Sequence, residues 1–153
     1  MAPRVGIGYD AHRFAEGRRL VLGGVEVDHP LGLEGHSDAD VVAHAVIDAV
    51  LGAAGLGDLG THFPPDEERW RDADSLDLLR TVVGQLRGRV LNVDATVICE
   101  GPRLGPHRTE MERVLAAAAG APASVKATTN EGMGAIGRGE GIACMAVALV
   151  DLD

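Results

Sequence analysis

The sequence predicts an α/β (α+β) domain in which helices pack against a single-layer mixed β-sheet. Strand-like and helix-like apolar patterns alternate along the 153 residues, which is typical of layered folds of this kind. Hydrophobic residues make up 46% of the chain and aromatic residues only 3%, so we expect a packed core of Val, Leu, Ile and Ala. No repeat or linker divides the sequence, and residues 1–153 are therefore expected to form a single domain.

The N-terminal elements begin with a strand-like Val-Gly-Ile-Gly-Tyr pattern in residues 4–14. Residues 20–22 and 25–27 then flank two glycines, which can take the positive φ of a tight turn, so a β-hairpin is expected there. The first helix is expected to start within residues 35–40, with Ser37 as its cap, because apolar residues recur at helical spacing afterwards.

The remaining elements continue the alternation of helices and strands. A second helix is expected to start at Asp74-Ser75, and a third to cover residues 106–119 with a proline near its first turn. Strands are expected over residues 91–98, 124–128 and 142–150. The last is apolar throughout, which predicts a strand covered on both faces, either by a helix layer or by another subunit.

Charge and composition exclude several classes of partner. The formal net charge of −9 disfavours nucleic acid and anionic membranes, and the few aromatic residues disfavour base stacking. No apolar segment is long enough for a signal peptide or a membrane helix, so a soluble protein is expected. Cys99 and Cys144 follow no metal or redox spacing and lie in apolar runs. We therefore expect them to be buried, reduced thiols in a cytoplasmic protein.

Three residues form a candidate metal site. Asp10 and His12 are two positions apart and leave the same face of an extended strand, and a carboxylate with an imidazole suits a divalent ion such as zinc. His44 lies within the first helix, where Asp40 and Asp48 share its face and could hold its second ring nitrogen. Three protein ligands would leave an open coordination position. Spacing alone also allows His44 to be an ordinary core or surface residue.

Two glycine-containing segments permit anion binding without requiring it. Residues 132–137 match G-x-G-x-x-G, but a strand rather than a helix is expected next, which argues against a dinucleotide fold. This segment could let amides and Arg138 approach a phosphate, or it could be a flexible connection between strands. Residues 35–37 could likewise bind an anion at a helix N-terminus or could form an ordinary cap.

Five segments occur in a characteristic order and spacing. They are Gly8-Tyr9-Asp10-Ala11-His12, His36-Ser37-Asp38-Ala39-Asp40 with His44, Gly57-Asp58-Leu59-Gly60, Lys126-Ala127-Thr128-Thr129-Asn130-Glu131, and Gly137-Arg138-Gly139-Glu140-Gly141-Ile142-Ala143. Together they make the chain resemble the 2-C-methyl-D-erythritol 2,4-cyclodiphosphate synthase family over about residues 4–150. The His-Ser-Asp-x-Asp and Gly-Arg-Gly-Glu-Gly segments are specific to this resemblance.

The resemblance implies a lyase of the non-mevalonate pathway of isoprene biosynthesis, assembled as a homotrimer with active sites between subunits. The implied substrate is 4-diphosphocytidyl-2-C-methyl-D-erythritol 2-phosphate. Its 2-phosphate would attack the β-phosphorus, releasing CMP and forming 2-C-methyl-D-erythritol 2,4-cyclodiphosphate without a redox cofactor. The resemblance also allows an isoprenoid diphosphate to bind along the trimer axis.

The resemblance also implies roles for individual residues. Asp10, His12 and His44 would bind Zn²⁺, and Glu131 would contact a second divalent ion, Mg²⁺ or Mn²⁺. His36 and Thr129 would stabilise the transition state. Substrate contacts are implied for Asp10, His12, His36, Ser37, Ala135 and Arg138. The erythritol part would be contacted by Asp58, Leu59, Gly60, Phe63, Pro64, Pro65, Asp66 and Glu67. The cytidine diphosphate part would be contacted by Cys99, Glu100, Gly101, Pro102, Arg103, Leu104, Gly105, Thr128, Thr129, Asn130 and Glu131.

Some positions depart from the common family pattern, namely Pro65, Glu67, Glu100, Arg103 and Ala135. All lie in segments expected to contact substrate, so individual contacts should differ, although Arg103 keeps the positive charge of the usual lysine.

Two other functions stay open from the residues alone. A metal-dependent phosphohydrolase would add solvent oxygen to its product. A non-catalytic binder of nucleotides or isoprenoid phosphates would not need His44.

Overall fold

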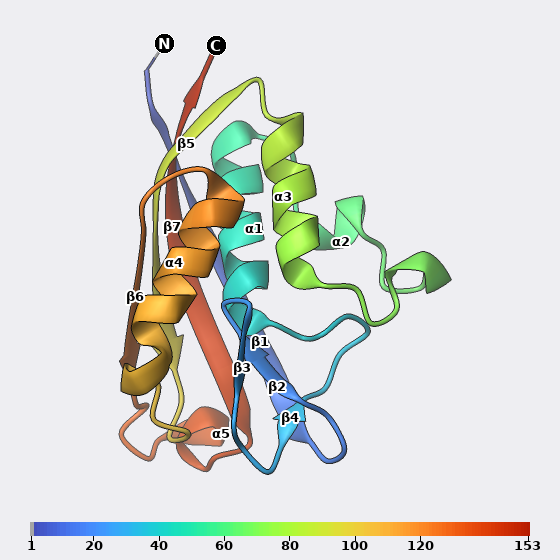
Figure 1. The fold of residues 1–153 in the computed structure, drawn as a ribbon, viewed down its shortest axis with the longest axis vertical. Coiled ribbons are helices and arrows are strands. Elements are labelled where there is room, and N and C mark those ends of the chain that lie inside the picture. Colours follow the sequence, from blue (N-terminus) through green and yellow to red (C-terminus); the bar gives the residue numbers. More distant parts are fainter. Residues whose placement is uncertain (1) are drawn as a thin grey trace.

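The computed structural model describes residues 2–153 and contains a five-stranded mixed sheet (Figure 1). The strands β5 (Gly88–Ile98) and β6 (Ala123–Thr128) pair in parallel, whereas the other neighbouring strands of this sheet are antiparallel. A separate hairpin pairs β2, Leu20–Leu22, with β3, Val25–Val27, as the two glycines predict. In spatial order the sheet strands are β4 (Gly32–Leu33), β1 (Arg4–Ala15), β7 (Gly141–Leu152), β5 (Gly88–Ile98) and β6 (Ala123–Thr128).

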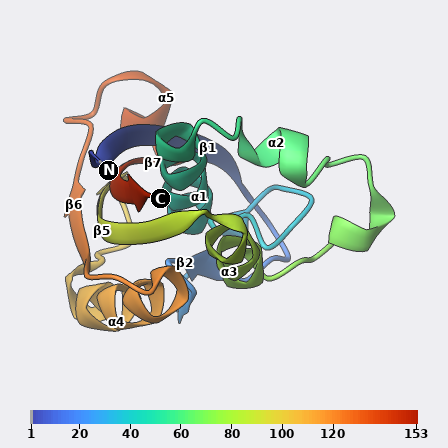
Figure 2. The ribbon, with the colours of Figure 1, turned by 90° about the horizontal axis from the view of Figure 1, so that it is seen from above.

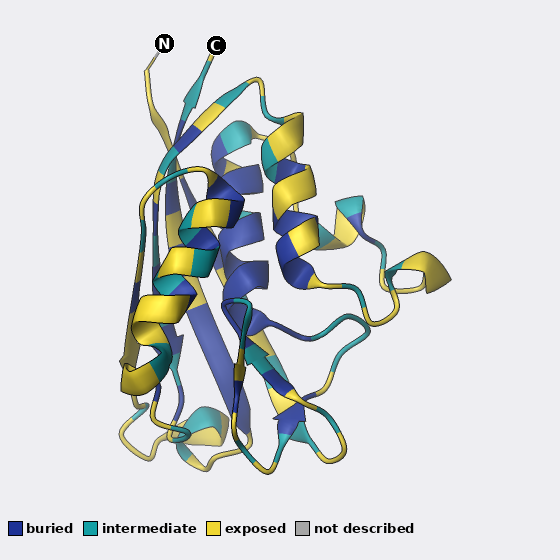
Figure 3. Cartoon of the chain, in the orientation of Figure 1, coloured by how far each residue is buried: buried dark blue, intermediate teal, exposed yellow. Residues whose placement is uncertain are grey.

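Three longer helices lie along one face of this sheet, as Figure 1 and Figure 2 show. They are α1 (Val41–Ala54), α3 (Ser75–Gln85) and α4 (Arg108–Ala119). The α1 helix lies between the sheet and α3 and is almost entirely buried (Figure 3). The predicted mixed sheet packed by helices is thus confirmed. Within residues 2–153, no helix has both the length and the apolar character required to cross a membrane.

The structure also contains four short helical segments that the sequence patterns do not predict as separate elements. They are α2 (Leu59–His62), α5 (Gly134–Gly137) and the 3₁₀ turns η1 (Glu68–Trp70) and η2 (Gly105–His107). Each has three or four residues, too few to show an apolar period. All four belong to connections rather than to the core layers (Figure 1).

Two glycines bring α1 unusually close to β1. A Cβ atom at Gly6 would collide with the carbonyl oxygen of Ala49, and one at Gly8 would collide with that of Ala45. Glycine in a strand is suited to such a close approach of another backbone segment. The Val-Gly-Ile-Gly pattern therefore sets the distance between the strand that carries Asp10 and His12 and the helix that carries His44.

The start of α1 differs from the sequence-based expectation, because Asp40 rather than Ser37 caps the helix. The Asp40 carboxylate accepts hydrogen bonds from the amides of Val42 and Ala43, at 3.1 and 3.0 Å. It also accepts amide hydrogen bonds from Gly23 and Gly24 of the hairpin, at 2.8 and 2.7 Å. A fully buried carboxylate with four backbone donors thus ties the hairpin to the beginning of the helix.

The sheet face opposite the helices is apolar and exposed. Because Gly6 and Gly8 face α1, the alternating residues of β1 point to the other side, and β7 contributes two more side chains. The helix layer therefore covers β7 on one face only, and the other face is uncovered in the single chain. We call this surface the open apolar face; it consists of Val5, Ile7, Tyr9, Met145 and Val147.

Candidate metal centre

Three potential metal ligands converge between β1 and α1. Asp10 Oδ2 lies 2.8 Å from His12 Nε2 and 3.0 Å from His44 Nδ1. The two histidine nitrogens are 3.4 Å apart. Within residues 2–153, this is the group of three or more His, Cys, Asp or Glu side chains whose ligand atoms approach one another closely. The structure thus brings His44 to the strand pair, which spacing alone could not establish.

The geometry and the donor set both fit a bound zinc ion. Ligand atoms that surround a zinc ion tetrahedrally at about 2.0–2.1 Å are about 3.3 Å from one another. The three observed separations of 2.8, 3.0 and 3.4 Å are close to this value. Two imidazoles and one carboxylate are donors that zinc accepts readily. Three protein ligands also leave a coordination position for a substrate oxygen, as in catalytic rather than structural zinc sites.

The second ring nitrogen of each histidine has its own partner. His12 Nδ1 lies 2.7 Å from the Glu34 carbonyl oxygen, which places a proton on Nδ1 and makes Nε2 the ring nitrogen that can bind a metal once its own proton is lost. His44 Nε2 lies 2.8 Å from Ser75 Oγ and 3.2 Å from Ser37 Oγ. Ser75 is a residue that sequence reasoning identified only as the start of a helix, because no local spacing connects it with His44.

The carboxylates expected beside His44 have other partners, so that prediction is wrong. Asp40 caps α1 and binds the hairpin amides, as described above. Asp48 accepts a hydrogen bond from the Leu59 amide at 2.7 Å. Both residues share the helix face of His44, but each satisfies a backbone donor that would otherwise be unpaired.

Electrostatic coupling favours the charged forms of Asp10 and His12. Burial tends to raise the pKa of Asp10, but hydrogen bonds with His12 and His44 and their charges outweigh it and lower this pKa to about 2. Burial tends to lower the pKa of His12, but the hydrogen bond with Asp10, its negative charge and the Glu34 carbonyl raise it above the usual value. Asp10 is therefore ionised at neutral pH and available as a metal ligand.

The loop after β4, which carries His36 and Ser37, contacts the metal centre through Ser37. Ser37 Oγ is 3.2 Å from His44 Nε2, as noted above. His36 Nε2 lies 3.0 Å from the Glu67 carbonyl oxygen, and this contact connects His36 with the predicted erythritol-binding residues 63–67. Asp58 caps α2, which is held to α1 through the contact between Leu59 and Asp48. These segments therefore lie on the same side of β1 as α1.

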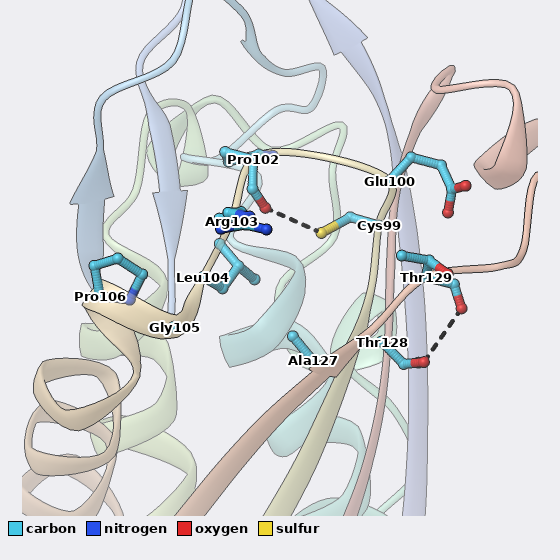
Figure 4. Close-up of a pocket in the computed structure, with 10 residues that line it drawn as sticks. All are labelled: Cys99, Glu100, Pro102, Arg103, Leu104, Gly105, Pro106, Ala127, Thr128 and Thr129. Atoms are coloured by element: carbon cyan, nitrogen blue, oxygen red, sulfur yellow. Dashed lines mark hydrogen bonds between the residues drawn. The ribbon is translucent and has the colours of Figure 1, made fainter.

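A separate cavity of about 630 Å³ opens between η2 and the end of β6 (Figure 4). Residues 99–100, 102–106 and 127–129 line it, and Arg103 supplies the positive charge among them. The structure thus brings together most of the two segments predicted to hold cytidine diphosphate. Gly101, Asn130 and Glu131 do not line this cavity.

Glu100 organises the loop that follows β6. Its two carboxylate oxygens accept hydrogen bonds from the amides of Asn130 and Gly132, at 2.8 and 3.0 Å. Between them, Glu131 takes a left-handed φ of 53°, and its amide bonds to Thr129 Oγ1 at 3.2 Å. Glu131 is exposed and does not join the triad within this chain.

The glycine-rich segment ends beside His12. Ala135 and Ile136 line a cavity of about 170 Å³ together with His12 and its neighbours in β1. The Arg138 guanidinium donates a hydrogen bond to Glu140 at 2.7 Å. The four-residue α5 is followed by β7, so this G-x-G-x-x-G segment does not start the long helix of a dinucleotide-binding unit.

Both cysteines are buried free thiols, as expected. Burial, together with the nearby charge of Glu100, raises the pKa of Cys99, and burial is also the main cause of the raised pKa of Cys144. Neither thiol therefore has the character of a nucleophile or metal ligand.

Comparison with known proteins gives consistent matches over almost the whole chain. Residues 3–151 match the model of the YgbB family. A 2-C-methyl-D-erythritol 2,4-cyclodiphosphate synthase from Gloeobacter violaceus is 55% identical, covering 97% of this chain and 94% of the relative. One from Symbiobacterium thermophilum is 57% identical, covering 95% and 97%. A solved structure of such a synthase, described as a CDP-bound form, has a TM-score of 0.87 and 34% identity, covering 97% of this chain and 100% of the other.

Proposed function

Because the chain belongs to the YgbB family, we propose that it converts 4-diphosphocytidyl-2-C-methyl-D-erythritol 2-phosphate into 2-C-methyl-D-erythritol 2,4-cyclodiphosphate and CMP. Its similar relatives carry the name of this synthase at 52–57% identity. The enzyme is accordingly a lyase of the non-mevalonate route to isoprenoids. The structural observation that best supports this chemistry is the convergence of Asp10, His12 and His44.

In this reaction the protein mainly has to position the substrate and stabilise the negative charge of its phosphates. An oxygen of the 2-phosphate forms a bond to the β-phosphorus, while the bond from that phosphorus to the bridging oxygen breaks and CMP leaves with the electron pair. The attacking oxygen is already anionic, so no side chain has to remove a proton from it. Folding the substrate into an in-line geometry is therefore the main task of the surrounding residues.

We propose that the triad holds Zn²⁺, which would supply positive charge next to the diphosphate. Asp10, His12 and His44 are its proposed ligands, and the separations of their ligand atoms, 2.8, 3.0 and 3.4 Å, support this proposal. Glu131 is the proposed contact of a second ion, Mg²⁺ or Mn²⁺. An exposed carboxylate next to the nucleotide cavity suits an oxygen-preferring cation that also binds phosphates.

The remaining site residues are assigned by their place in the fold. The 630 Å³ cavity is the proposed site of the cytidine diphosphate part, with Thr129 at its edge. Residues 58–60 and 63–67 are proposed to contact the erythritol part. His36, which contacts Glu67, and Thr129 are proposed to stabilise the transition state. Ser37, Ala135 and Arg138 are the remaining proposed substrate contacts.

We further propose that the working enzyme is a homotrimer with active sites between chains. In one chain the triad lies on β1 and α1 and the cavity beside β5 and β6, with β7 between β1 and β5 in the sheet. The metal centre and the cavity share no residue. A neighbouring chain packed on the open apolar face could bring a second cavity to each metal centre. An isoprenoid diphosphate on the trimer axis and a cytoplasmic location stay predictions.

The test is incubation of the purified protein with Zn²⁺, Mg²⁺ and the diphosphocytidyl substrate in ¹⁸O-enriched water, followed by mass spectrometry of the products. We expect CMP and the cyclic diphosphate, both without ¹⁸O. Incorporation of ¹⁸O would identify a phosphohydrolase instead. Substrate binding without any CMP release would identify a non-catalytic binder.

A further inference from the structure

A buried hydroxyl connects His44 with a carboxylate that is not itself a metal ligand. Ser75 Oγ lies 2.8 Å from His44 Nε2 and donates a short hydrogen bond to Asp38 Oδ1. Ser75 is fully buried and His44 is 5% exposed. Both polar groups are thus removed from water, and each depends on protein partners for its hydrogen bonds.

The donor and acceptor in each of these hydrogen bonds follow from the role of His44 as a metal ligand. A metal bound at His44 Nδ1 requires a lone pair there, so the ring proton must be on Nε2. That proton is donated to Ser75 Oγ, and the single proton of Ser75 is donated to the Asp38 carboxylate. Each of these atoms then has one role. If Ser75 donated its proton to His44 instead, its oxygen and the Asp38 carboxylate would face each other as two acceptors.

Asp38 is itself fixed by backbone groups. Its Oδ2 accepts from the Ser75 amide at 3.0 Å, and its Oδ1 accepts from the Asp40 amide at 3.1 Å. The Asp38 amide donates to the Ala73 carbonyl oxygen at 3.1 Å. These bonds connect the loop before α1 with the first turn of α3. They therefore hold the Asp38 carboxylate in place beside the Ser75 hydroxyl.

Ser37 is the competing partner of His44 Nε2, but its geometry is weaker. Its Oγ is 3.2 Å from Nε2, compared with 2.8 Å for Ser75. The same oxygen also accepts a hydrogen bond from the Ala39 amide, and Ser37 is only partly buried. Ser75 is therefore the group that determines where the ring proton of His44 lies.

We propose that Ser75 is a positioning residue of the metal centre, which, held by Asp38, fixes the tautomer and orientation of His44 for metal binding. This inference rests on the proposed metal site and adds a residue to it. Partners of ligating histidines are commonly carboxylates or carbonyl oxygens that act directly. Here a serine stands between the imidazole and the carboxylate.

The test measures Zn²⁺ affinity by competition with a chromophoric chelator for the wild-type protein and its Ser75→Ala variant. We expect about 10- to 100-fold weaker binding in Ser75→Ala, the usual effect of removing such a partner. Ser75→Thr, which keeps the hydroxyl, should recover most of the affinity. In the zinc-loaded wild type, the Nε2 proton of His44 should give a slowly exchanging NMR signal that Ser75→Ala loses.

A matched control is Ser124→Ala. Ser124 also donates a hydrogen bond to an aspartate, Asp94 at 2.9 Å, but it lies on the edge strand β6 and does not contact the triad. Its zinc affinity should equal that of the wild type. Denaturant unfolding of each metal-free variant establishes that it is folded. Asp38→Asn, which weakens the acceptor of Ser75, provides a second test with an expected smaller loss of affinity.

The outcomes separate this inference from the proposed function. Equal zinc affinity in folded Ser75→Ala and wild type would overturn the positioning role and leave the metal site intact. Lower affinity in both Ser75→Ala and Ser124→Ala would also overturn it, because the effect would then be general. A wild-type protein that binds no zinc would overturn both the metal site and the role of Ser75.

Discussion

At the scale of single residues, the geometry predicts that a proton and a metal ion compete for His12 in the proposed metal centre. Its Nε2 atom faces Asp10 at 2.8 Å, and its Nδ1 atom faces the Glu34 carbonyl oxygen. Both partners favour the doubly protonated ring and raise the pKa of His12, although burial opposes this. A metal ion must displace the Nε2 proton before it can bind.

Zinc affinity should therefore fall as the pH is lowered. Because the pKa of His12 is raised, the metal-free ring stays protonated to a higher pH than an ordinary histidine, and protons compete with zinc near neutrality. We expect binding about tenfold weaker at pH 6 than at pH 8. Isothermal titration at a series of pH values measures this, and an affinity that does not vary with pH would contradict it.

Local residue spacing predicts part of the metal site but not all of it. Asp10 and His12 are predictable because a strand places residues two apart on one face. The partners of His44 are not, since helix periodicity offers Asp40 and Asp48 but not Ser75. Asp40 and Asp48 bind amides from the hairpin and from α2, and those contacts depend on tertiary structure.

At the scale of elements, the site depends on how closely α1 approaches β1. Gly8 lies against the backbone of Ala45, the residue after His44, and is two positions before Asp10. Any side chain at Gly8 would push the helix away from the strand. Metal ligands tolerate only small changes in separation, so this contact should matter for the proposed zinc binding as well as for packing.

Replacement of Gly8 by Ala should weaken both the packing of α1 on β1 and zinc binding. The added methyl group would collide with the Ala45 carbonyl, and we expect a loss of about 3 kcal/mol in the free energy of unfolding together with weaker zinc binding. Gly52→Ala in α1 is a matched control, because its Cβ would meet only the Ile7 carbonyl oxygen at 3.8 Å. It should change stability by at most about 1 kcal/mol, in the favourable direction. Denaturant unfolding and zinc titration distinguish the two variants, and equal behaviour would contradict this account.

Element prediction succeeds where periodicity is long and fails where it is short. The three longer helices and the hairpin follow from apolar spacing and turn glycines. The start of α1 is displaced because Ala39 takes a left-handed φ of 57°, which prevents the helix from beginning at Ser37. The α2 and α5 helices are single turns held by contacts with other segments, so the sequence has no periodic signal for them.

At the scale of the whole molecule, the open apolar face is the main feature that one chain leaves unexplained. Its side chains are between 42% and 69% exposed, and all lie on two adjacent strands. Contiguous apolar surfaces of this kind usually mark protein interfaces. The sequence predicts that β7 is covered on both faces, but it cannot distinguish a helix layer from a neighbouring chain.

A charge on this face should therefore prevent formation of the proposed trimer. We expect Ile7→Glu to shift the protein from trimer to monomer in light scattering coupled to size exclusion, because a carboxylate would be buried without a partner. CMP release should be lost while zinc binding is retained. Leu56→Glu is the control, since Leu56 is 41% exposed but lies outside the open apolar face. Its mass and activity should match the wild type, and an Ile7→Glu variant that remains trimeric would contradict the proposed interface.

The central claim is that a metal held by Asp10, His12 and His44 supports the cyclisation. The most direct measurement is the rate of CMP release by chelator-treated protein, with Mg²⁺ present, as Zn²⁺ is added back. The account predicts almost no CMP release without zinc and a rise that saturates at one zinc ion per chain. Full CMP release by protein that contains no zinc would contradict it.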